Sequence, residues 1–150
     1  MRFCRFNITV VFIFFSALIS HAQETTLKLI KTVAVSAQFI EVDNVGNIYA
    51  VKQSEISKYD THGNFVMKNS AMAFGEITSL DATNALKMIL FFKDLSQIFY
   101  LDNQLSNRGE RLELDMFGYF QTTAVCRSYN NGIWLYDQTT FELSRFTEQF

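Results

Sequence analysis

The strongest constraint on the fold of this chain is a unit of three short, largely apolar segments that occurs three times. The segment "SEISKYD" at residues 54–60 aligns with "SQIFYLD" at 96–102 and with "FELSRFT" at 141–147, at intervals of about 40 to 45 residues. Apolar and polar residues alternate with a period of two in these segments, which is the pattern of a half-buried β-strand. The chain is therefore predicted to be all-β and built from repeated strand, turn, strand units.

Two further strands precede the aligned segment in every copy. No long window carries a helical stripe, and residues 70–77 are the best short candidate for a helix. The predicted first strands cover residues 37–43, 76–81 and 122–128, the central strands 47–51, 87–92 and 132–136, and fourth strands are expected near 65–68 and 111–114.

A period of this length with four strands per repeat is typical of β-propeller blades, because a four-stranded sheet needs neighbours on both faces. We predict a partial β-propeller of about three four-stranded antiparallel blades, with a β-sandwich as the alternative. Through the elements "DNVGNIY" and "ISKYD", residues 37–146 resemble secreted bacterial β-propeller proteins of the NHL or YVTN kind, including uncharacterised exported proteins of Bacteroidota. The resemblance implies a fold and no particular activity.

Three blades fall short of the four to eight that closed propellers contain. We therefore expect the propeller-like domain at residues 23–150 to be incomplete at its carboxyl end. In a complete relative, residues 27–35 would supply the missing outer strand of the last blade. The terminal blades are expected to expose apolar surface and unpaired strand edges, through which the chain could self-associate.

The first 22 residues have the layout of a signal peptide. Arg2 and Arg5 precede a run without charge at residues 6–20, and small residues at Ser20 and Ala22 predict cleavage between Ala22 and Gln23. A permanent membrane anchor is the alternative, but the run is shorter than the roughly 20 residues of a membrane span. The mature protein is predicted to be secreted or periplasmic, with no stable membrane insertion after cleavage.

Charge and cysteine content narrow the function further. The chain has a net charge of −2, and loss of Arg2 and Arg5 would make it more acidic, so no nucleic-acid partner is predicted. Cys126 is the only cysteine after cleavage, which leaves no intramolecular disulfide. It lies in an apolar run and is predicted to be buried.

Aspartate and glycine mark the turns between strands. Asp43 with Gly46 and Asp60 with Gly63 predict type I turns that end in a left-handed residue. Asp81 with Asn84 and Ser128 with Asn131 predict the same geometry, since asparagine tolerates the left-handed conformation. Each of the first two turns has one carboxylate, too few for calcium, so neither a metal site nor a cofactor is predicted.

Catalytic motifs do not stand out in the sequence. After cleavage the one histidine is His62, in a predicted turn, and there is no G-x-S-x-G, phosphate-binding glycine loop or H-E-x-x-H. We predict a non-enzymatic binding or interaction module. The alternative is part of a propeller hydrolase or lyase whose catalytic residues lie in further blades.

The loops that follow the central strands lie at the end of the sheets opposite the aspartate and glycine turns. They are the candidate binding surface, because they lack the turn residues and differ between copies. These loops lie at residues 52–54, 93–96 and 137–140. A comparable row of aromatic residues, Tyr49, Phe91 and Trp134, is predicted to pack between blades. The predicted ligand-binding residues are Lys52, Gln53, Lys93, Asp94, Asp137 and Gln138.

Overall fold

The structure is a computed structural model that describes residues 26–147. The chain divides into two compact units, Met1–Thr32 and Val33–Phe150. The described part of the first unit, residues 26–32, has no regular secondary structure, and all the strands belong to the second unit. The predicted signal peptide lies outside the described residues.

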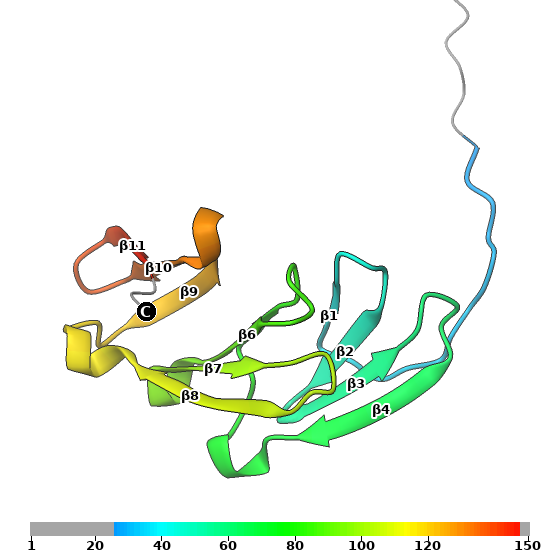
Figure 1. The fold of residues 1–150 in the computed structure, drawn as a ribbon, viewed down its shortest axis with the longest axis horizontal. Helices are drawn as coiled ribbons and strands as arrows, with labels where there is room; N and C mark the ends of the chain where they lie inside the picture. The colour runs from blue at the N-terminus through cyan, green and yellow to red at the C-terminus, as the bar shows by residue number, and fades with distance from the viewer. Residues whose placement is uncertain (1–25, 148–150) are drawn as a thin grey trace, which may run out of the picture. The chain divides into compact units, whose positions relative to one another are not determined.

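The second unit contains three antiparallel sheets, each made from strands that follow one another in the sequence (Figure 1). The all-β prediction is confirmed, and every strand expected in residues 37–147 is present within a few residues. The first sheet contains β1 Phe39–Val42, β2 Ile48–Lys52, β3 Glu55–Tyr59 and β4 Phe65–Ser70; the second contains β5 Ser79–Asp81, β6 Met88–Phe92, β7 Gln97–Leu101 and β8 Asn107–Glu113; the third contains β9 Thr122–Arg127, β10 Ile133–Asp137 and β11 Glu142–Phe146.

Short 3-10 helices occur in the connections. The segment 70–77, the best helical candidate, forms only one such turn. Residues 27–35 were expected to supply a strand in a complete relative. They do not form a strand in this structure. Within residues 26–147, no helix has the length and apolar character of a membrane span. The four 3-10 helices are η1 Met72–Phe74, η2 Lys93–Leu95, η3 Leu114–Phe117 and η4 Tyr129–Asn131.

The second sheet is covered on both faces. All five residues of β6 are buried, which a strand exposed on one side would not allow. Leu90 and Phe99 pack with Tyr49 of the first sheet, whereas Ile89 and Phe91 pack with Leu135 of the third. Two apolar clusters therefore lie between consecutive sheets, one on each side of the second sheet.

We call the face of a sheet that points toward the next sheet along the chain its leading face, and the opposite one its trailing face. Tyr49 and Phe91 lie on leading faces and are completely buried between sheets, which confirms that they are core residues. Trp134 lies on the leading face of the third sheet, because it pairs with Cys126 while the adjacent Leu135 packs inward. No described sheet covers that face, so Trp134 is only half-buried.

Candidate functional site

The Asp43 turn is held by the aspartate side chain itself. Oδ1 accepts hydrogen bonds from the N–H groups of Val45 (3.0 Å) and Asn47 (2.9 Å). Oδ2 accepts from Asn47 Nδ2 (2.8 Å) and from the buried Tyr49 hydroxyl (2.9 Å). Burial opposes ionisation, but these donors outweigh it and hold the pKa of Asp43 below its usual value. Both oxygens are thus engaged in the fold.

The same turn occurs twice more. Asp60 accepts from the N–H groups of His62 and Asn64, with Gly63 left-handed at φ +72°. In the β7–β8 turn, Asp102 accepts from the N–H groups of Gln104 and Ser106 (both 2.9 Å). Its left-handed position is Leu105, at φ +56°. Sequence reasoning missed this turn, because a leucine is rarely left-handed; burial of Leu105 in the first apolar cluster offsets the strain.

The other two predicted turns, after β5 and after β9, do not repeat the geometry of the Asp43 turn. Asn84 does not adopt a positive φ, since the β5–β6 connection is longer and Asp81 instead bonds Thr83 and Arg127 N–H. The prediction for Asn84 is therefore wrong. Asn131 is left-handed at φ +58°, as predicted, and Asn130 before it is also left-handed.

Two of the three candidate binding loops meet at a common surface. Gln53 donates its N–H to Gln38 Oε1, and Gln38 Nε2 in turn donates to Glu76 Oε1 (2.5 Å). The Gln53 carbonyl accepts from Ile77 N–H (2.9 Å). These bonds attach the β2–β3 hairpin to the connection that leads into the second sheet.

Lys93 and Asp94, both in η2, lie at the same surface as Gln38 and Glu76. Lys93 N–H donates to Thr78 Oγ1 (2.9 Å), which fixes the start of η2 against the beginning of the second sheet. A cavity of about 310 Å³ lies here, and a neighbouring one of about 300 Å³ shares Glu76. We call the two together the polar hollow; its lining is Gln38, Phe39, Glu76, Ile77, Thr78, Lys93 and Asp94 in the first cavity and Gln53, Ser54, Gly75 and Glu76 in the second.

The third loop has a different role. Asp137 is only 1% exposed, and its carboxylate accepts from the N–H groups of Gln121 (2.9 Å), Thr139 (2.8 Å) and Thr140 (3.3 Å). Burial opposes ionisation of Asp137, but these N–H groups outweigh it and lower its pKa. Asp137 thus fixes the entry to the third sheet and is not an exposed loop ligand, contrary to the prediction.

The remaining two candidate residues lie outside the hollow. Gln138 is exposed, and its N–H bonds the carbonyl of Gln121 (2.9 Å). Lys52 is exposed at the end of β2 but lines neither cavity. The structure therefore brings Gln53, Lys93 and Asp94 together.

Sequence reasoning missed Gln38, Glu76 and Thr78, although the meander pattern contains a usable signal. In antiparallel strands the entry of the first strand lies level with the exit of the second. Gln38 N–H accordingly bonds the Val51 carbonyl (2.8 Å), and Thr78 N–H bonds the Phe91 carbonyl (2.9 Å). Residues just before each first strand could have been assigned to the same end as the loops.

The polar hollow combines opposite charges with neutral hydrogen-bonding groups. Glu76 and Asp94 supply two carboxylates against the single ammonium group of Lys93, so negative charge prevails. Gln38 adds an amide and Phe39 an apolar wall. Such a lining suits a small polar ligand, with a preference for one that carries a positive charge.

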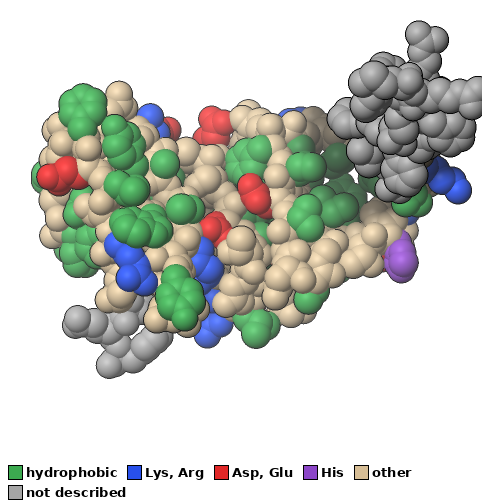
Figure 2. Space-filling view, turned by 90° about the horizontal axis from the view of Figure 1, so that it is seen from above, with side chains coloured by type: hydrophobic (Ala, Val, Ile, Leu, Met, Phe, Trp, Pro, Cys, Tyr) green, Lys and Arg blue, Asp and Glu red, His purple; other side chains and the backbone are tan. Residues whose placement is uncertain are grey.

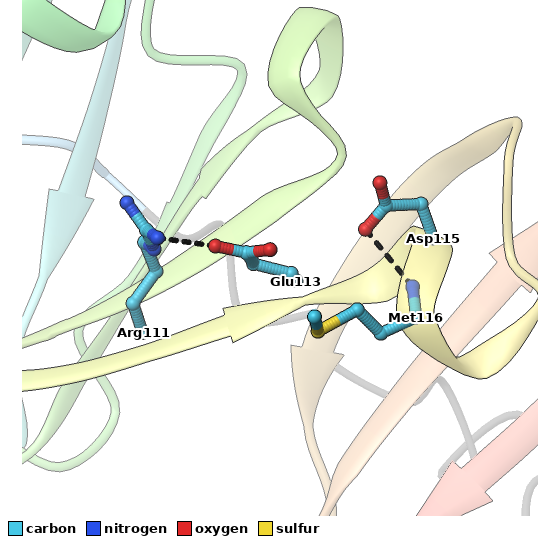
Figure 3. A network of polar contacts seen from close by, with 4 residues as sticks. All are labelled: Arg111, Glu113, Asp115 and Met116. Atoms are coloured by element: carbon cyan, nitrogen blue, oxygen red, sulfur yellow. Dashed lines mark hydrogen bonds and ion pairs between the residues drawn. The ribbon is translucent and has the colours of Figure 1, made fainter.

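A shallower hollow of about 590 Å³ lies along β8 and η3. Arg111 there forms an ion pair with Glu113, and Asp115 Oδ1 accepts from the Met116 N–H (2.9 Å), as Figure 3 shows. The Arg111 guanidinium group is already neutralised by a carboxylate from its own strand. This hollow therefore offers less uncompensated charge than the polar hollow.

The first strands of the sheets bring Glu41, Asp81 and Cys126 near one another. Burial, and secondarily repulsion from Asp81, raise the pKa of Glu41. Partial desolvation of the sulfur atom, and secondarily the negative charge of Asp81, raise the pKa of the Cys126 thiol, which disfavours the reactive thiolate. Cys126 is exposed, and the prediction of burial is wrong because β9 alternates and directs Val125, not Cys126, to the second sheet.

Replacing Glu41 by glutamine should stabilise the protein modestly at neutral pH. A carboxyl group with a raised folded-state pKa destabilises the native state when it is ionised in both states. The gain from Glu41→Gln should therefore vanish below the ordinary glutamate pKa of 4.5 and grow as the pH rises above it. Thermal melts from pH 3 to 8 provide the measurement. The exposed Glu142→Gln is the control, and a glutamine variant less stable at pH 7 would contradict the prediction.

Among residues 26–147 no group of three or more His, Cys, Asp or Glu side chains is arranged to hold a metal ion. His62 is exposed in the β3–β4 turn. No protein-family model matches the chain, and no curated protein matches it either.

Proposed function

We propose that this protein is an exported, non-catalytic binding module of propeller type that takes a small amine-bearing ligand in the polar hollow. The observation that carries the proposal is the convergence of Gln38, Glu76, Lys93 and Asp94 at one end of two neighbouring sheets. The signal-peptide pattern of residues 1–22 supports the proposal of export.

The stacking of the sheets supports the propeller assignment. Each sheet is a meander, and the second is packed against a neighbour on each face, as a blade within a ring would be. The first strands also lie together: β5 contacts β9, and Arg127 N–H donates to Asp81 Oδ2 (2.6 Å). In a propeller the first strands of successive blades surround the central channel.

The construction of the hollow supports a binding role. Its walls are held by hydrogen bonds between Gln53 and Gln38, between Gln38 and Glu76, and between Lys93 and Thr78. A site fixed by such bonds is preorganised, which lowers the entropy lost when a ligand binds. A carboxylate pair beside a single ammonium group favours amines over acids of similar size.

The test is an NMR titration of the ¹⁵N-labelled protein with arginine, cadaverine, glucose and glutamate. We expect arginine and cadaverine to shift the amide resonances of Thr78, Lys93 and Asp94 in a saturable, salt-sensitive manner. Glutamate should shift them far less. If none of the four probes moves these resonances, the proposed ligand class is wrong.

A pair of matched variants separates the site from general surface charge. Asp94 and Asp115 each lie in the first turn of a 3-10 helix, but only Asp94 lines the polar hollow. Asp94→Ala should weaken amine binding at least several-fold, whereas Asp115→Ala should leave it unchanged. Equal losses in the two variants would show nonspecific attraction to an acidic protein.

A further inference from the structure

The charged groups of the polar hollow do not neutralise one another. Within residues 26–147, Lys93, Asp94 and Glu76 form no ion pair, although all three line the same cavity. Glu76 Oε1 accepts a hydrogen bond from Gln38 Nε2 (2.5 Å), and the other oxygen of this carboxylate has no partner among the described residues. One ammonium group and two carboxylates, all of them exposed, are therefore available to a ligand.

Opposite charges pair directly at other places on the surface. Lys68 Nζ lies 2.7 Å from Glu55 Oε2, between β4 and β3, and Arg111 pairs with Glu113 along β8. Such pairs form where two long side chains can reach each other. The polar hollow brings both signs into one cavity without a pair of this kind, so a ligand does not have to break an ion pair before it binds.

The backbone that carries these charges is held in place. Lys93 N–H donates to Thr78 Oγ1 (2.9 Å), and the Lys93 carbonyl accepts from Ser96 N–H (3.0 Å), which closes η2 at a left-handed residue. On the other connection, Ile77 N–H donates to the Gln53 carbonyl (2.9 Å) directly after Glu76. The ammonium group and one carboxylate thus come from η2, and the second carboxylate comes from the segment that enters β5.

An apolar wall lies between the charged groups. Phe39 is half-buried and packs against the first apolar cluster, and Ile77 is only 2% exposed. Both line the cavity of about 310 Å³, which is at the lower end of the roughly 300 to 1,000 Å³ of small-molecule pockets. The size and the wall suit a small ligand in which a short hydrocarbon chain separates charged ends.

Long-range attraction contributes little selectivity, because the charges of this protein are few and mixed in sign. The net charge is −2. Figure 2 shows acidic and basic side chains interspersed on the visible face, with no large patch of one sign. A ligand of either sign is therefore steered only weakly from a distance. Selection among charged ligands must come from the contacts inside the polar hollow.

We infer that the ligand of the polar hollow is a basic α-amino acid, such as lysine or arginine, whose α-carboxylate pairs with Lys93 and whose two cationic groups pair with Glu76 and Asp94. The hollow holds one positive and two negative groups, and such an amino acid holds two positive and one negative, so every charge meets its opposite. The methylene groups of the ligand pack on Phe39 and Ile77. This inference rests on the proposed function and adds that Lys93 selects for the carboxylate.

The test compares each amino acid with the amine that lacks only its carboxylate: lysine with cadaverine, and arginine with agmatine. Dissociation constants come from NMR titrations that follow the amide resonances of Thr78 and Asp94 in the parent protein and in Lys93→Met. The variant should bind lysine and arginine about two- to fivefold more weakly, which is the range of an exposed ion pair. It should bind cadaverine and agmatine as tightly as the parent or more tightly, because a positive charge has left the hollow. A purely structural role for Lys93 would weaken all four ligands alike.

Two further variants control for charge and for folding. Lys68→Met removes the same charge from β4, where the side chain lines neither cavity of the hollow, and it should leave the preference for the amino acids unchanged. Lys93→Arg keeps a positive charge at the same position and should keep the preference. Thermal melts of the three variants show whether each is folded at the temperature of the titration.

The outcomes separate this inference from the proposed function. If all four ligands bind and Lys93→Met weakens each amino acid and its amine equally, the hollow is a site for amines alone; the inference is then wrong and the proposed function stands. An equal change of preference in Lys68→Met and Lys93→Met would show a general effect of charge and would also overturn the inference. If none of the four ligands shifts the resonances of the parent protein, both the proposed function and the inference are refuted.

Discussion

Phe91→Ala is expected to lower the free energy of unfolding by about 3 to 5 kcal/mol. The ring is completely buried on the leading face of the second sheet, where Leu135 and Ile133 of the third sheet pack around it. Removing it leaves a cavity in the apolar cluster that joins the two sheets, where Ile89 and Val125 also pack. Chemical denaturation with the linear extrapolation method measures the loss.

Phe65→Ala is the control, because that ring is 60% exposed and its loss should be small. Amide hydrogen exchange adds a local readout: protection in β9 and β10 should fall more in Phe91→Ala than protection in β2 and β3. A cost of less than about 1 kcal/mol, well under the range for a buried phenylalanine, would show that the second and third sheets do not pack as described.

Asp43→Ala, as a separate variant, is also expected to lower the free energy of unfolding by about 3 to 5 kcal/mol. The change removes the acceptor for four donors in the turn, and it leaves the buried Tyr49 hydroxyl without its carboxylate partner. Asp43→Asn, which keeps one acceptor oxygen but cannot accept at the second position, should fall between the alanine variant and the parent. Tyr49→Phe should relieve part of the penalty in the alanine background.

The Asp60 turn provides the matched comparison, because it has the same bonds from the backbone and from its asparagine but no buried hydroxyl. Asp60→Ala should therefore cost clearly less. The pKa of Asp43 is lowered in the folded state, so its contribution is present above the ordinary aspartate pKa of 3.8 and is lost as the pH falls below it. The parent and Asp43→Ala should converge in acid; a constant difference from pH 7 to pH 2 would contradict this assignment.

The strands and their order could be predicted because they depend on local pattern. Alternation of period two determines which residues face inward, and the Asp43 and Asp60 turns follow from residues that are close in sequence. Three of the residues that line the polar hollow were predictable from the same local pattern. Gln53, Lys93 and Asp94 lie in loops that break the turn pattern.

The errors arose where a residue's environment comes from another sheet or another turn. Asp137 has the sequence context of a polar loop, but its carboxylate is taken up by N–H groups that include Gln121, which is distant in sequence. Leu105 is left-handed only because the first apolar cluster accommodates its side chain. The exposure of Cys126 depends on which face of the third sheet has a neighbour, and one sheet's sequence does not contain that information.

The sequential order of the strands has a consequence for how the protein acquires its structure. Every strand pairs only with its neighbours along the chain, so each sheet can assemble from local hairpins with little loss of loop entropy. The leading face of the first sheet nevertheless stays bare until the residues of β6 and β7 are available to cover it. During synthesis from the amino terminus, the early part of the chain should therefore remain a substrate for chaperones until the second sheet has emerged.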